Sequence, residues 1–206
     1  MRRALPLVAA LASLVAAPLA VADGDPASDY LIGQKVFYSF DAGIPADQGQ
    51  RLNTLVDDAN RAGFKIRVAL IRTNSDLGSV YQLYGKPQRY AQFLGQELLF
   101  VYRSRLLIVM PNGFGYAVRG LAAPQAKRAL RGLATPGNDG PRIADAAMLA
   151  VQRLATAAGH DLTLPKASSG NSQNSDRIKI GAIAVTAAAV LAAAMLVRRG
   201  RRATRQ

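Results

Sequence analysis

The stretch Leu106-Leu107-Ile108-Val109-Met110-Pro111-Asn112-Gly113 decides the fold class of this chain. Its first five residues are all apolar, as in a strand that is covered on both faces of a sheet. The Asn-Gly pair that follows is among the strongest short signals for a hairpin, and the returning strand is expected at 116–118. The pattern therefore predicts a hairpin whose first strand lies inside a sheet between two layers of helices.

Strand and helix patterns alternate on both sides of this hairpin. Residues 36–40 are β-prone, and residues 66–71 alternate and then run apolar, as a strand that becomes buried would. Helical spacing is seen after Pro45, over 90–98, after Pro124 and over 142–158. The sum predicts an α/β fold, a Rossmann-like three-layer sandwich with a mixed sheet of about four strands and helices on both faces.

Two apolar segments bracket this domain. Residues 1–22 begin with Met1-Arg2-Arg3 and end on Ala20-Val21-Ala22, which is typical of a secretory signal peptide. Residues 178–197 are apolar enough, and nearly long enough, for a transmembrane helix of roughly 20 residues. The basic tail 198–206 that follows is expected in the cytoplasm by the positive-inside rule. The domain is expected outside the cytoplasm even if the first segment is retained as a membrane anchor, because Arg2 and Arg3 would hold the start of that segment in the cytoplasm.

These segments predict one folded domain at 35–165, a flexible linker at 166–177 and a single membrane pass. Residues 23–33 are expected to be a short, partly polar lead-in. The expected localisation is the cell membrane, with the N-terminal domain extracytoplasmic and the C-terminus cytoplasmic. Because the chain has no cysteine, the domain must be held together by its core without disulfides.

The positive charge of the chain is concentrated outside the domain. The formal net charge of +13 falls to +5 once Arg2, Arg3, Lys179 and the five arginines of the tail are set aside. No nucleic-acid motif is present, so no nucleic-acid partner is expected. The expected partners are the membrane itself and a membrane or envelope protein.

Several segments resemble the TPM domain, a family of membrane-tethered or secreted α/β modules that includes the thylakoid acid phosphatase. The residues that carry the resemblance are Phe40-Asp41-Ala42-Gly43-Ile44, Lys65-Ile66-Arg67-Val68-Ala69-Leu70-Ile71, Tyr90-Ala91, 106–110, 133–140 and 143–147. The resemblance implies a scaffold, and some relatives bind calcium and hydrolyse phosphate esters. One departure is the bulky and basic stretch 100–105, where many relatives have a glycine-rich approach to the strand.

Oxygen-bearing side chains follow the predicted strands, where open α/β sheets usually place ligands. Asp41 follows the first strand, whereas Asn138, Asp139 and Asp145 surround the loop before the last helix. Oxygens from separate loops suit calcium, which takes six to eight of them. Ordinary local roles explain the same residues: a turn at Asp41, an Asn-Asp-Gly turn at Asp139 and a favourable first-turn charge at Asp145. Asp76, past the second strand, is either a further ligand or a helix cap.

Three arginines flank the hairpin. Arg103, Arg105 and Arg119 are candidates to hold a phosphate by bidentate contacts, and solvated charges at strand ends explain them equally well. Two functions stay open. The first is a non-enzymatic binding or assembly module at the membrane surface, with the aromatic run around Tyr81, Tyr84, Tyr90 and Phe93 as a contact surface. The second is a calcium-assisted phosphate-ester hydrolase in which Asp41, Asp139 and Asp145 hold the ion.

Overall fold

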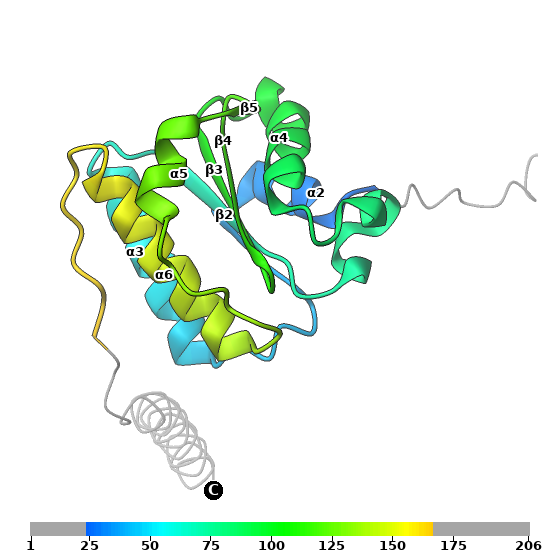
Figure 1. The fold of residues 1–206 in the computed structure, drawn as a ribbon, viewed down its shortest axis with the longest axis horizontal. Helices are drawn as coiled ribbons and strands as arrows, with labels where there is room; N and C mark the ends of the chain where they lie inside the picture. The colour runs from blue at the N-terminus through cyan, green and yellow to red at the C-terminus, as the bar shows by residue number, and fades with distance from the viewer. Residues whose placement is uncertain (1–23, 167–206) are drawn as a thin grey trace, which may run out of the picture. The chain divides into compact units, whose positions relative to one another are not determined.

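A mixed sheet of five strands forms the middle layer of the domain in the computed structural model, which describes residues 24–166 (Figure 1). The strands are β1 (Val36–Tyr38), β2 (Ile66–Leu70), β3 (Arg105–Met110), β4 (Gly113–Val118) and β5 (Leu121–Ala122). They lie side by side in chain order. The first three are parallel, and β4 and β5 are antiparallel to their neighbours. The predicted hairpin is confirmed, but its return strand begins at Gly113, opposite Met110, so the loop residues are Pro111 and Asn112.

Helices cover both faces of this sheet, which confirms the three-layer α/β sandwich (Figure 1). One face packs on α3 (Ala46–Arg61), α5 (Pro124–Leu130) and α6 (Gly140–Thr156). The other packs on α2 (Pro26–Gly33), the 3₁₀ helix η1 (Asn74–Leu83), α4 (Pro87–Glu97) and the short η2 (Leu98–Phe100). Because side chains alternate along a strand, Leu107 and Val109 of β3 join the first core, whereas Leu106 and Ile108 join the second.

The sequence predicted no strand order for the Rossmann-like sandwich, and the order observed is not that of a Rossmann fold. A Rossmann sheet reverses its strand order at a switch point, whereas this sheet advances from β1 to β5 without reversal. The β1-to-β2 connection crosses through α3 on one face, and the β2-to-β3 connection crosses through η1 and α4 on the other. Both connections lead to the next strand in the same direction across the sheet, but they pass over opposite faces. Their handedness must therefore be opposite. One crossover is therefore left-handed, against the strong right-handed rule.

The fifth strand was not expected from the sequence. β5 has two exposed residues and pairs with the end of β4 through the Arg119-Gly120 turn. A strand this short carries no alternation of apolar and polar residues. Only its pairing with β4 reveals it.

Helix α2 extends the packed part of the chain to residues before Lys35, where the domain was expected to start. Ala27 and Leu31 of α2 are fully buried, and Asp25 caps the helix by accepting a hydrogen bond from the Ala27 amide at 3.1 Å. The helix buries only two of its residues, so its sequence has weak helical amphipathicity. The sequence therefore resembled a partly polar lead-in.

Within residues 24–166, no helix is long and apolar enough to cross a membrane. The predicted signal peptide (1–22), the linker beyond Lys166, the transmembrane helix (178–197) and the basic tail (198–206) all lie outside the described residues. Those assignments stay predictions.

Candidate functional site

Two connections leave the carboxyl ends of β1 and β2 in opposite directions. The first runs to α3 on one face of the sheet, and the second runs to η1 on the other. Open α/β sheets bind ligands where neighbouring connections part in this way. The loop before α6 also comes to this edge, since a Cβ atom at Gly140 would lie 2.0 Å from the carbonyl oxygen of Ala42. The structure therefore brings the segment after β1 against the segment before α6.

Arg72, the second residue after β2, joins these two loops. Its Nε donates to Asn138 Oδ1 at 3.2 Å, and its Nη1 donates to the backbone carbonyl oxygen of Asp41. Sequence reasoning did not single out Arg72 as a site residue. Its position directly past the carboxyl end of a buried strand was the signal that it faces the ligand edge of the sheet.

At Asp41 it is the backbone carbonyl, not the carboxylate, that Arg72 contacts, whereas the carboxylates of Asp139 and Asp145 have partners of their own. Asp139 Oδ2 lies 3.2 Å from Arg142 Nε, an ion pair within the first turn of α6. Asp145 Oδ1 accepts a hydrogen bond of 2.6 Å from Gln48 Nε2, and the same nitrogen donates to the Pro141 carbonyl oxygen at 3.0 Å. Gln48 is 5% exposed and ties α3 to α6. Sequence reasoning did not single it out, because a glutamine near a helix start has no distinctive pattern.

These contacts decide how well the predicted calcium ligands fit a metal. Asn138 Oδ1 and the Asp41 carbonyl already accept hydrogen bonds from the Arg72 guanidinium, which supplies the positive charge there. Among residues 24–166, no three His, Cys, Asp or Glu side chains converge in a way that could hold a metal ion. A calcium ion at these oxygens would have to displace a guanidinium, so the arrangement does not fit a preformed cage.

Asp76 is a helix cap. It is 5% exposed, and its Oδ2 accepts hydrogen bonds from the backbone amides of Arg72 at 2.9 Å and Thr73 at 2.7 Å. Thr73 and Asp76 form a capping box at the start of η1. Of the two roles left open for Asp76, the structure confirms the cap.

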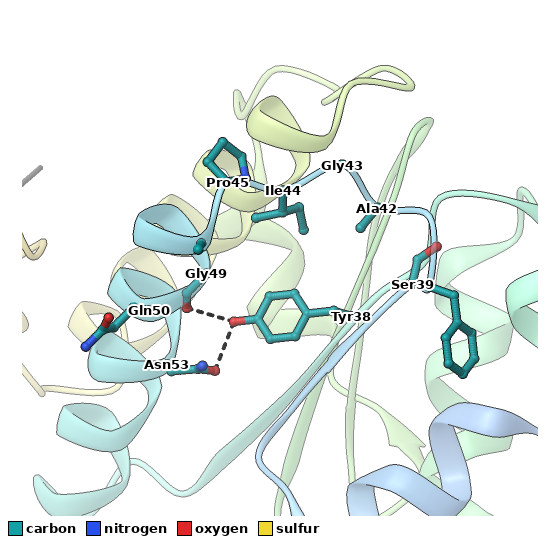
Figure 2. A pocket seen from close by; sticks show the side chains of 11 residues that line it. Tyr38, Ser39, Ala42, Gly43, Ile44, Pro45, Gly49, Gln50 and Asn53 are labelled. Carbon is teal, nitrogen blue, oxygen red and sulfur yellow. Dashed lines mark hydrogen bonds between the residues drawn. The ribbon is translucent and has the colours of Figure 1, made fainter. Parts of the chain in front are cut away.

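A pocket of about 510 Å³ opens at the carboxyl end of β1 (Figure 2). Every side chain that lines it is uncharged: Tyr38, Ser39, Phe40, Ala42, Gly43, Ile44, Pro45, Ala46, Gly49, Gln50 and Asn53. The Tyr38 hydroxyl lies 2.8 Å from the Gly49 carbonyl oxygen and 2.9 Å from Asn53 Oδ1. Figure 2 shows this ring reaching from β1 to α3. Burial raises the pKa of Tyr38, so the phenol stays protonated at neutral pH.

Two side chains of this pocket are not satisfied by contacts within the described domain: one is exposed, and one is buried without a hydrogen bond. Phe40 is 88% exposed, which is unusual for a phenylalanine. Ser39 is 3% exposed, and its Oγ has no hydrogen-bond partner in the described part of the chain. Phe40, Ile44 and Pro45 give the pocket an apolar lining, and Gln50 and Asn53 add polar groups. Such a surface suits binding better than acid–base chemistry, since it carries no titratable group near neutral pH.

The three candidate phosphate-binding arginines lie at the opposite edge of the sheet. Arg105 begins β3 and Arg119 follows the antiparallel β4, so both are at the amino ends of the parallel strands. A five-residue strand separates the two edges by about 17 Å. Arg103 and Arg119 line one cavity of about 620 Å³. Arg105 instead lies over the Phe64 ring, 4.5 Å from its centre.

The expected aromatic contact surface is divided between the exterior and the core. Tyr81 is 62% exposed and Tyr84 is 36% exposed. Tyr90 is fully buried, and its hydroxyl lies 2.8 and 2.9 Å from the two carboxylate oxygens of Asp25. Phe93 stacks on Tyr90, with 6.4 Å between ring centres. Half of the run therefore belongs to the second core.

Comparisons with protein-family models, with curated proteins and with solved structures find no match to this chain. The fold and the site themselves describe a three-layer α/β domain with an uncharged pocket at the carboxyl end of its edge strand.

Proposed function

We propose that this chain is a membrane-tethered extracytoplasmic module of the TPM type, which binds a membrane or envelope protein and performs no reaction of its own. The observation that carries the proposal is the uncharged pocket beside Phe40, at the edge of the sheet where α/β domains bind ligands. An exposed aromatic ring next to an apolar and amide-lined hollow is the composition of a protein interface.

The partners of the candidate catalytic groups support a binding role. Asp139 and Asp145 are held by Arg142 and Gln48, and Arg72 takes the acceptors that a metal would need. The arginines suited to phosphate lie about 17 Å away at the other edge. A phosphatase needs its phosphate-binding cations and its activating group within reach of one phosphorus atom.

The tether and the family assignment rest on sequence. A signal peptide at 1–22 and a transmembrane helix at 178–197 would hold the domain outside the cytoplasm. The order strand, helix, strand, helix, hairpin, helix, helix is the order in which the segments resemble the TPM domain.

A calcium-assisted phosphate-ester hydrolase is the second candidate. The observation in its favour is the contact between the Asp41 loop and the Asn138-Asp139 loop, which come from distant parts of the chain. A hydrolase of this kind would require Arg72 to leave its two acceptors when calcium binds.

Calcium titration separates the two candidates. We expect the melting temperature of the purified chain to show no saturable rise with calcium, because Asn138 Oδ1, Asp145 Oδ1 and the Asp41 carbonyl oxygen already accept hydrogen bonds. A native-state site would stabilise by about 2.7 kcal/mol at a hundredfold excess over Kd. A saturable rise that Asp139→Ala removes, together with phosphate-ester turnover lost in the same variant, would select the hydrolase.

Site-specific photo-crosslinking tests the binding surface. A photoreactive residue in place of Phe40 should give a discrete adduct in native membranes, whereas one in place of Ala157 should not. Ala157 is exposed and ends α6 at the other edge of the sheet, so it is a matched control. Equal adducts at both positions, or none at Phe40, would refute the pocket as the contact surface.

A further inference from the structure

A long part of the domain contains cations and no carboxylates. Between Glu97 and Asp139 the chain has no Asp or Glu, and it has six basic residues: Arg103, Arg105, Arg119, Lys127, Arg128 and Arg131. None of the six takes part in an ion pair within residues 24–166. This stretch includes β3, β4, β5 and α5, so these elements carry six positive charges and no carboxylate of their own.

Exposed apolar side chains lie at the same edge as two of these cations. Phe100 is 92% exposed, Val101 55% and Leu121 64%. Phe100, Arg103 and Arg119 line one cavity. Leu121 is held nearby, because Gln96 Nε2 donates to the Gly120 carbonyl oxygen at 3.1 Å. We call Phe100, Val101, Leu121, Arg103 and Arg119 together the basic tip.

Arg119 has an unusual backbone conformation. Its φ of 53° is the only positive φ of a non-glycine residue in the described part of the chain. It occupies the first central position of the turn between β4 and β5, with Gly120 second. Turns of this kind favour Asn, Asp or Gly at that position, so turn formation does not account for an arginine. The turn displays its exposed side chain at the tip.

We infer that the basic tip docks on an anionic phospholipid surface, with Phe100, Val101 and Leu121 entering the headgroup region and Arg103 and Arg119 contacting lipid phosphates. This combination of apolar side chains with a cationic collar is typical of proteins that lie on a bilayer. The inference rests on the membrane tether of the proposed function and adds which face of the domain meets the bilayer.

The expected length of the tether brings the bilayer within reach. A linker with the composition and length of residues 166–177 spans about 19 Å on average. A domain of this size has a radius of gyration of about 14 Å, and is therefore roughly 37 Å across. On average the domain therefore stays within its own width of the headgroups. Charge then favours the basic tip, because anionic lipid attracts its arginines, whereas at the other edge Arg142 is already paired with Asp139.

Tryptophan fluorescence can report this contact, because the chain has no tryptophan of its own. The Phe100→Trp chain would be reconstituted at full length in vesicles of phosphatidylcholine, with or without phosphatidylglycerol. We expect a blue shift of its emission, and quenching by brominated lipid, only with phosphatidylglycerol. The matched control is Phe40→Trp, since Phe40 is 88% exposed at the opposite edge, and its emission should not respond to lipid charge.

A second pair of substitutions isolates the cations. Arg119→Asn keeps a residue that this turn favours, so its folding should be preserved. Combined with Arg103→Gln in the Phe100→Trp chain, it should abolish the blue shift, as should high salt. Emission that is the same in both vesicle types, or a response of Phe40→Trp instead, would overturn the docking. If the basic tip instead binds an acidic protein, the emission of the Phe100→Trp chain will be the same in both vesicle types.

Retention on the vesicles distinguishes the two possible failures. A chain that does not float with the vesicles refutes the tether, and the docking with it. A chain that floats but gives no blue shift refutes the docking alone and leaves the tethered binding module standing.

Discussion

Asp25 is a carboxylate that folding removes from water. It is 4% exposed, and its Oδ1 accepts from the Tyr90 hydroxyl at 2.8 Å and from the Ala27 amide at 3.1 Å. Burial raises its pKa from 3.8 to about 6, although these two hydrogen bonds act in the opposite direction. The nearby charges of Glu97 and Asp29 add to the rise.

The direction of this pKa shift sets the pH dependence of stability. Because the pKa of Asp25 is higher in the folded state, the folded chain binds more protons between about pH 4 and pH 6. The stabilisation is complete below the unfolded pKa and is lost as the pH rises through the folded pKa. The shift corresponds to about 3 kcal/mol of unfolding free energy at most.

Asp25→Asn should therefore remove this pH dependence. The amide keeps an acceptor for the Ala27 amide and carries no charge, so the variant should be more stable than the parent chain at pH 7.5. Urea unfolding at pH 4.5 and pH 7.5 measures the difference. Asp29→Asn, an exposed change in the same helix, should leave the pH dependence in place. An unaltered pH dependence in Asp25→Asn would contradict the assignment.

The helix η1 depends on its capping box more than on its own hydrogen bonds. Its backbone is non-helical at Gly78 and Val80, so it is in effect two short turns. Asp76 stabilises the start of η1 by accepting hydrogen bonds from two backbone amides, and Leu77 is fully buried in the second core. The cap and the apolar contacts of Leu77, Val80 and Leu83 with the second core hold this element between β2 and α4.

Asp76→Ala should consequently destabilise the domain. Loss of a cap costs about 1–2 kcal/mol of unfolding free energy, and here two backbone amides would lose their acceptor. The matched control is Asp58→Ala, which removes an exposed carboxylate paired with Arg61 and should cost well under about 1 kcal/mol. Chemical denaturation of both variants compares the two costs; equal costs would mean that the box does not stabilise η1.

Helix α2 makes the whole domain larger than its sequence pattern indicated. It covers the face of the sheet that also carries η1 and α4, and its Leu31 is fully buried in that core. A truncation that removes α2 together with Asp25 would also leave the buried Tyr90 hydroxyl without its hydrogen-bond acceptor.

A chain that starts at Lys35 should be markedly less stable than one that starts at Gly24. Exposing the surface under Leu31 and Ala27 costs at least about 3 kcal/mol of unfolding free energy. The midpoint of urea unfolding should fall for two purified pieces that both end at Lys166. Equal midpoints would show that α2 is dispensable and that the core closes without it.

The two edges of the sheet have different chemistry. The carboxyl edge carries the uncharged pocket and a set of paired polar groups. The amino edge carries arginines that make no ion pair within residues 24–166, beside exposed apolar side chains. In the proposed arrangement, one edge binds a protein and the other meets the bilayer. A single domain can do both because the strands separate the two surfaces by about 17 Å.

Most helices and strands of this fold could be predicted from the sequence, because each has a short-range pattern of apolar residues. The apolar runs at 66–71 and 106–110, the Asn-Gly turn and the apolar faces of α3 and α6 are patterns within a few residues of one another. The three layers follow from them, because apolar strands with amphipathic helices can bury their apolar surfaces only in a sandwich.

The site depended on contacts that no local pattern contains. Arg72 meets Asn138 across 66 positions of sequence, and Gln48 meets Asp145 across 97. Both contacts exist because the crossovers leave β1 and β2 over opposite faces and the loop before α6 closes on Ala42. Periodicity specifies which face of an element is buried, whereas only the packing of loops decides whether a carboxylate faces a metal, an amide or a guanidinium.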